Sequence, residues 1–174
     1  MEADFEKRVE KMDPRFEGNE WTLESKRAGI DDAVNEIIRR MKESGWNEDE
    51  IGLFQVAITE ALANAIIHGN LGLKKDQNED KGVYDDRVSA AENDPKLVGK
   101  KVLVGINIAP DEAIISVTDE GDFVAKEKSA EVEDANIYTY SGLGGGLIYL
   151  ICDRVETSPG KVTLYKKRNA EAKK

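Results

Sequence analysis

Three polar side chains that could do chemistry lie in the segment EALANAIIHGN, residues 60–70. Glu60, Asn64 and His68 are four residues apart, and each step of four advances a helix by only about 40°, so they share one stripe. Between residues 51 and 67 the only charged residue is Glu60. An unpaired buried carboxylate is costly, so Glu60 needs a cation, a hydrogen-bond donor or a ligand. On this segment alone, bonding to nearby backbone groups and a ligand site are equally good interpretations.

A second candidate is the segment TDEGDF, residues 118–123, which follows an alternating apolar pattern. An ionised Asp119 only accepts hydrogen bonds, which suits an exocyclic amine such as that of adenine. Gly121 allows the backbone to approach a ligand closely. A plain turn at the end of a strand is the alternative interpretation.

The third candidate is the glycine cluster GLGGGL, residues 142–147, which an apolar run at 148–151 follows. Glycines that lead into a helix N-terminus offer free N–H groups and the positive end of the helix dipole, which suit a phosphate. A flexible loop is the alternative. The cluster is not a Walker A loop, because no Lys-Ser/Thr pair follows it.

The order of these three segments resembles the nucleotide-binding boxes of the GHKL ATPase superfamily, which includes gyrase, the Hsp90 chaperone, histidine kinases and MutL. Within it, the chain is most similar to the bacterial anti-sigma-factor serine-protein kinases, through EALANAIIHGN and the strand end DEG. The resemblance covers about residues 21–167. It implies ATP and Mg²⁺ as cofactors, and it implies a sigma factor and an anti-anti-sigma (STAS-type) protein as partners.

The resemblance also implies a role for each site residue. Glu60 would be the catalytic general base, and Asn64 would bind ATP and ligate Mg²⁺. Asp119 would read adenine, with Gly121 beside it. Within a lid at about 122–146, the glycines under the phosphates would be Gly142, Gly144, Gly145 and Gly146. We interpret His68, the only histidine, as a residue at the helix C-terminus and not as a phosphoacceptor.

Three departures from the family pattern bear on activity. Phe123 stands where a second glycine is usual, and Lys161 follows Gly160 where the family has threonine. Residues 129–151 contain no Lys or Arg, whereas related lids often supply one to the γ-phosphate. The implied function is transfer of the ATP γ-phosphate to a serine of the STAS-type partner. The alternative is a nucleotide-gated protein-binding switch module with little or no kinase turnover.

The elements that must position these residues follow from periodicity. Helical spacing predicts helices at 30–44 and 47–67, and alternation predicts strands at 21–26, 102–108, 112–119 and 161–167. We expect an α+β fold, a two-layer α/β sandwich with helices on one face of a mostly antiparallel sheet. The resemblance implies the same arrangement, the Bergerat-type ATPase fold. Residues 71–100 are polar without clear periodicity, so we expect a loop or insertion that the core does not need.

Composition limits the remaining possibilities. The 174 residues, 40% apolar, predict one domain, at 20–168. Residues 1–19 are charged and end in the breakers Pro14 and Gly18, which predicts an N-terminal extension, and residues 169–174 are a tail. A net charge of -10 argues against a nucleic-acid or anionic-membrane surface. Cys152 is the only cysteine, and we expect it to be a small buried hydrophobe. Since we find no signal peptide and no apolar run of membrane-spanning length, we expect a cytoplasmic protein, and we allow for a homodimer.

Overall fold

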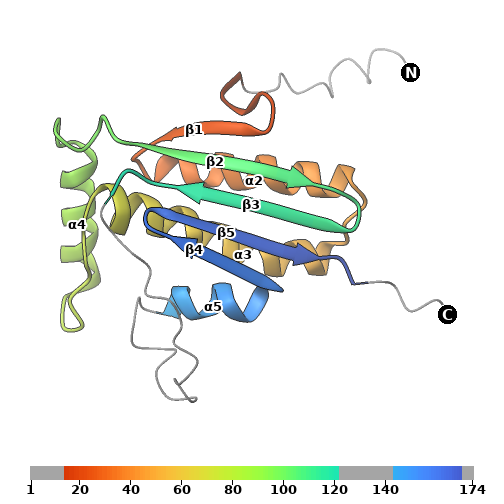
Figure 1. The fold of residues 1–174 in the computed structure, drawn as a ribbon. Coiled ribbons are helices and arrows are strands. Elements are labelled where there is room, and N and C mark those ends of the chain that lie inside the picture. The colour runs from red at the N-terminus through yellow and green to blue at the C-terminus, as the bar shows by residue number, and fades with distance from the viewer. Residues whose placement is uncertain (1–13, 122–142, 170–174) are drawn as a thin grey trace, which may run out of the picture.

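The structure is a computed structural model that describes residues 14–121 and 143–169. Its elements are η2 (Pro14–Phe16), β1 (Glu20–Glu24), α2 (Ala28–Glu43), α3 (Glu48–Ala63), η3 (Asn64–Asn70), α4 (Lys81–Glu92), β2 (Lys101–Ile108), β3 (Glu112–Thr118), α5 (Leu143–Ile151), β4 (Arg154–Ser158) and β5 (Lys161–Lys167). Helices α2 and α3 lie side by side behind the sheet, α5 lies next to α3 at the β4 edge, and α4 stands at one end of the sheet (Figure 1). The predicted two-layer α+β fold is confirmed.

The sheet has five strands in the order β1-β2-β3-β5-β4, and every neighbouring pair is antiparallel. The four predicted strands are present. Strand β4 was not predicted, because it is an edge strand with no fully buried residue and its apolar alternation is weak. Strand β4 pairs with β5 across a turn at Gly160, whose φ of 69° favours glycine.

The core lies between the sheet and the helices. Alternate residues of β2 and β3 face it, as the sequence predicts: Val102, Val104, Ile106, Ala113, Ile115 and Val117. The predicted apolar face of α3 and η3 is also buried: Phe54, Ile58, Ala61, Leu62, Ala65 and Ile66. Fully burying one large side chain of this kind contributes about 1.5–3 kcal/mol, so these two faces fix the layers. Cys152 is buried as expected, and burial raises the pKa of its thiol to about 11.

Helix α3 begins where the sequence predicts and continues without a break into a π-helix. The side chain of Asn47 caps it by accepting a hydrogen bond from the Glu50 amide at 2.9 Å. The π-helix η3 closes with a bond from the Leu71 amide to the Ile66 carbonyl oxygen at 2.8 Å. The helix is therefore longer than the predicted 47–67.

The continuous helix Glu48–Asn70 corrects one expectation. It has 23 residues and a hydropathy of 1.4, so by length and composition it could cross a membrane. The expectation that no apolar run reaches that length is therefore wrong. The core helix of a domain can have the same length and hydropathy. In this helix, 44% of the most apolar 18-residue stretch is buried inside the domain.

Residues 71–100 include a packed helix, so the expectation of a loop is wrong for α4. This helix buries Val88 and Ala91. Arg27, before the start of α2, holds it through an ion pair of 3.0 Å with Glu92. Two buried positions in twelve residues give only a faint helical pattern, which is why periodicity did not reveal the helix.

Candidate functional site

Glu60 and Asn64 lie one turn apart where α3 passes into η3, and both are half-buried. Burial raises the pKa of Glu60, while the neighbouring side chains of Asn64 and His68 act in the opposite direction. A half-buried carboxyl with a raised pKa can accept a proton from a hydroxyl group in contact with it.

His68 lies in the last turn of η3, as predicted for a residue at the helix C-terminus. Its ring Nδ1 lies 2.5 Å from the carbonyl oxygen of Leu73. A carbonyl only accepts hydrogen bonds, so this nitrogen carries the proton. The contact ties the polar stripe to the chain that leaves the π-helix.

Asp119 and Gly121 follow β3 and lie against the end of η3. The Asp119 carboxylate accepts a hydrogen bond from the Gly121 amide at 2.8 Å, and the Asp119 amide donates to the Gly160 carbonyl at 2.8 Å. A Cβ on Gly69 would lie 2.4 Å from Cγ of Asp119, and a Cβ on Gly121 would lie 2.1 Å from the Gly69 carbonyl oxygen. Direct contact between the turn and the π-helix therefore requires glycine at both positions.

The electrostatic surroundings of Asp119 resemble those of Glu60. Burial raises the pKa of Asp119, and the hydrogen bond from the Gly121 amide and the charge of Lys100 act against the rise. No Lys or Arg side chain is an ion-pair partner of either carboxylate among the described residues. Glu60 and Asp119 are thus both half-buried, and neither has a paired cation among the described residues.

The glycine cluster is only partly within the described residues. Gly142 and the lid up to residue 142 lie outside them. Helix α5 begins at Leu143, so Gly144, Gly145 and Gly146 form part of its first turn. This differs from the expectation that the glycines precede the helix. Helix α5 packs against α3, which carries Glu60. The fold therefore places Gly144, Gly145 and Gly146 on the helix that neighbours α3, the helix of Glu60.

Two further residues at this place, Gly69 and Asn70, were not predicted. Both belong to the segment EALANAIIHGN, but nothing in their local spacing predicts a role. Gly69 contacts Asp119, as described above, and Asn70 accepts a hydrogen bond from the Glu120 amide at 2.7 Å. The only signal in the sequence is that Gly69 and Asn70 follow His68, the last residue of the polar stripe, directly.

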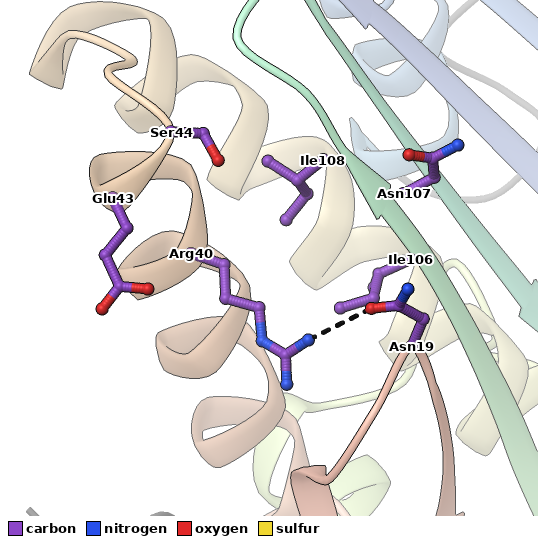
Figure 2. Close-up of a pocket in the computed structure, with 7 residues that line it drawn as sticks. All are labelled: Asn19, Arg40, Glu43, Ser44, Ile106, Asn107 and Ile108. Atoms are coloured by element: carbon purple, nitrogen blue, oxygen red, sulfur yellow. Dashed lines mark hydrogen bonds between the residues drawn. The ribbon is translucent and has the colours of Figure 1, made fainter.

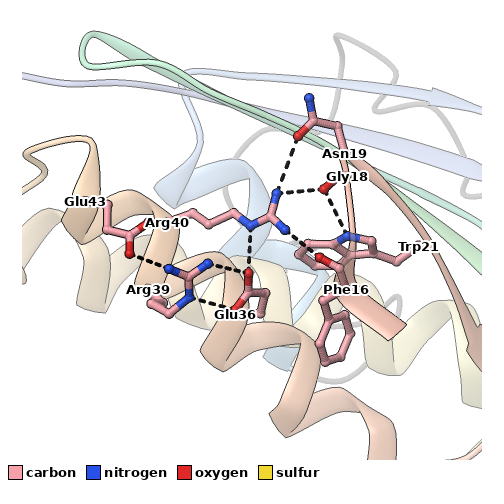
Figure 3. A network of polar contacts seen from close by, with 8 residues as sticks. All are labelled: Phe16, Gly18, Asn19, Trp21, Glu36, Arg39, Arg40 and Glu43. Atoms are coloured by element: carbon pink, nitrogen blue, oxygen red, sulfur yellow. Dashed lines mark hydrogen bonds and ion pairs between the residues drawn. The ribbon is translucent and has the colours of Figure 1, made fainter. Parts of the chain in front are cut away.

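A cavity of about 300 Å³ lies elsewhere, and no predicted site residue lines it (Figure 2). Its lining residues are Asn19, Arg40, Glu43, Ser44, Ile106, Asn107 and Ile108. The Arg40 guanidinium is engaged by Glu36 at 2.7 Å and by the Phe16 carbonyl at 2.6 Å (Figure 3). It also lies over the Trp21 ring, 4.9 Å from the centroid. These contacts tie the N-terminal turn to α2, so the network has a structural role.

A comparison with protein families identifies the domain. A family model described as a histidine kinase-like ATPase domain matches residues 24–166, and the chain belongs to this family. It is therefore an ATP-binding domain of the histidine kinase-like type, as the GHKL resemblance predicted. A search of curated proteins finds no significant match.

Proposed function

We propose that the chain is an ATP-binding anti-sigma regulatory factor with serine-protein kinase activity. It transfers the γ-phosphate of ATP to a serine of an anti-anti-sigma (STAS-type) partner, and it also binds a sigma factor. The observation that carries this proposal is Glu60, a half-buried carboxyl that lies one helical turn from Asn64 and whose pKa burial raises. A carboxyl in this state suits proton transfer from an attacking hydroxyl.

The residues of the site fit ATP. Asp119 offers an acceptor for the adenine amine, and the contact between Gly121 and Gly69 leaves backbone where any Cβ would clash. Asn64 offers an oxygen ligand to Mg²⁺. Among the described residues no group of three or more His, Cys, Asp or Glu could hold a metal ion. A single protein ligand suits Mg²⁺, which usually keeps waters and binds substrate phosphates.

The proposed reaction is a single displacement. The serine oxygen of the partner attacks the γ-phosphorus, its proton passes to Glu60, and the bond from the γ-phosphorus to the bridging oxygen breaks to release ADP. Mg²⁺, when bound, neutralises charge on the phosphates. Glu60 acts as the base, Asn64 would hold the Mg²⁺, and Asp119 fixes the adenine.

The test is transfer of labelled γ-phosphate from ATP to a STAS protein encoded nearby. We expect a labelled serine on the partner, and no label when that serine is replaced by alanine. Transfer to histidine, or label on the chain itself and none on the partner, would contradict the proposal.

A second candidate is a nucleotide-gated binding module with little turnover. It is favoured by charge: neither Glu48–Asn70 nor Leu143–Ile151 contains Lys or Arg, and residues 129–151 also lack them. Phosphoryl transfer needs positive charge near the leaving γ-phosphate. Equal affinity for ADP and ATP with excess Mg²⁺, together with nucleotide-dependent sigma binding and no transfer, would favour this module.

The proposal also includes the setting of the protein. A sigma-factor partner implies a cytoplasmic location and no direct role for nucleic acid or membrane. A homodimer is part of the proposal, and light scattering with and without ATP would measure it.

A further inference from the structure

We propose that Asn70 is a positioning residue that holds the turn Asp119–Gly121 in place for adenine and closes the base of the 71–100 segment. The inference rests on the proposed function in one respect, because it takes Asp119 as the acceptor for the adenine amine. It concerns a residue that touches neither the nucleotide nor the reacting atoms.

Asn70 is the last residue of η3, and its side chain is completely buried. Its Nδ2 donates to Ser25 Oγ at 2.8 Å and to the Lys101 carbonyl at 3.0 Å. Its Oδ1 accepts from the Glu120 amide at 2.7 Å. Both groups of the amide are therefore hydrogen-bonded within the protein, and these bonds compensate for the burial of a polar side chain.

These bonds form a closed ring. The Glu120 carboxylate accepts a hydrogen bond from the Lys101 amide, and the Lys101 carbonyl accepts from Asn70. Because Glu120 lies between Asp119 and Gly121, fixing its amide fixes the peptide bond that follows Asp119. Gly160 holds the other side of the turn through the Asp119 amide. One anchor of the turn is thus a hairpin backbone, and the other is a single side chain.

Asparagine is the residue type that this position requires. The ring needs a donor and an acceptor on one short side chain, and aspartate has no donor when ionised. An apolar residue would leave the Glu120 amide and the Lys101 carbonyl without their partner, which is unfavourable in a buried place. The adjacent Gly69 contacts the Asp119 carboxylate, so a shift at the end of η3 would move that carboxylate directly.

The same side chain closes the 71–100 segment. The segment begins directly after Asn70 and ends at Lys100, whose carbonyl accepts from Ser25 Oγ at 2.6 Å. Ser25 and Lys101, the two acceptors of Asn70, therefore lie at the segment's closing end. The α4-bearing segment and the Asp119 turn share one buried amide, which links the position of one to that of the other.

The test compares Asn70→Ala with Ser25→Ala by calorimetry, using ATP and purine riboside triphosphate, which lacks the adenine amine. We expect Asn70→Ala to weaken ATP binding about tenfold and to change binding of the analogue less than twofold. Ser25→Ala removes an acceptor of the same amide but leaves the bond to Glu120, so it should keep the preference for ATP. Equal losses for both nucleotides in Asn70→Ala, or no loss, would overturn the proposal.

A second measurement, amide hydrogen exchange, uses the wild-type protein without nucleotide. In the wild-type protein we expect the Glu120 amide to exchange with solvent as slowly as the β3 amides, because it donates to a buried oxygen. Exchange at the rate of an exposed loop would overturn the role of Asn70 and leave the kinase proposal intact. Conversely, failure of phosphate transfer with slow exchange and a preference for ATP over the analogue would overturn only the kinase proposal. Absence of that preference in the wild type would overturn the adenine role of Asp119, and with it this inference.

Discussion

Two carboxylates on neighbouring helices have opposite surroundings. Glu36 of α2 accepts hydrogen bonds from Arg39 at 2.8 and 2.9 Å and from Arg40 at 2.7 Å (Figure 3). The bond from Arg39 lowers the pKa of Glu36 in spite of its burial. Glu60 of α3 has no Lys or Arg as an ion-pair partner among the described residues, and burial raises its pKa.

A second pair of acids repeats the contrast. Burial acts to raise the pKa of Glu92, but hydrogen bonds from the Arg27 side chain and amide outweigh it, so the pKa is lowered. The pKa of Asp119, without an ion-pair partner, is raised. Glu36 and Glu92, which hold elements together, are matched with arginines, whereas Glu60 and Asp119 at the candidate site are not. Such acids are free to meet a proton or a donor from a ligand.

Glu60→Gln gives the largest expected effect. The substitution keeps size and polarity but removes the base, so we expect transfer to the STAS-type partner to fall by ~10²–10⁴-fold while ATP binding remains. Single-turnover transfer and calorimetry measure the two quantities. Glu36→Gln is the matched control and should transfer phosphate at the wild-type rate. If Glu60→Gln transfers normally, its role as base is excluded.

Arg40→Met tests the structural side of the comparison. It removes bonds to two backbone carbonyls and to Glu36, so we expect the free energy of unfolding to fall by about 2–3 kcal/mol. Arg39→Met is the control, because that side chain is 42% exposed; its loss should stay below about 1 kcal/mol. Urea unfolding measures both. A change in ATP affinity for Arg40→Met would show that the two regions are not independent.

Asp119→Asn tests nucleotide selectivity. An amide in place of the carboxylate presents a partly mismatched group to adenine, so we expect ATP binding to weaken by ~1–3 kcal/mol. Glu92→Gln, which changes an arginine-paired acid in the same way, should not alter the affinity. Calorimetry with ATP and GTP decides the matter: equal wild-type affinity for the two nucleotides would argue against an adenine-reading role.

The dependence of stability on pH gives the smallest and most direct test. A raised pKa in the folded state means that the ionised acid opposes folding, so Glu60 favours folding below its unfolded pKa near 4.5, and this contribution is lost as pH rises through the folded pKa. Glu36, with a lowered pKa, stabilises above 4.5 and loses this contribution as pH falls through its folded pKa. In nucleotide-free protein, Glu60→Gln should therefore raise stability at pH 7 and Glu36→Gln should lower it. Both differences from the wild type should shrink toward pH 3, and thermal unfolding between pH 3 and pH 7 measures them. If the two variants change stability in the same direction at pH 7, the comparison is wrong.

The sequence predicted the parts of the fold that bury regular apolar faces. Strands β2 and β3 and helices α2 and α3 each repeat an apolar residue at the period of their structure. Helix α4 and strand β4 bury few side chains and were missed for that reason. At the site, Glu60 stood out as a lone charge in an apolar run. The role of Asn70 depends on Glu120, fifty residues later, and no local pattern reports such a contact.

The π-helix η3 has a consequence for comparing and editing related chains. Its bond from Leu71 to Ile66 spans five residues where an α-helix spans four. Deleting any one residue of Asn64–Asn70 would let the helix close as an ordinary α-helix, and every later position would rotate by about 100°. Gly69 and Asn70, where they are retained, would then face away from the turn Asp119–Gly121. An alignment that places a single-residue gap in this segment would thus pair residues that match in type but occupy different faces.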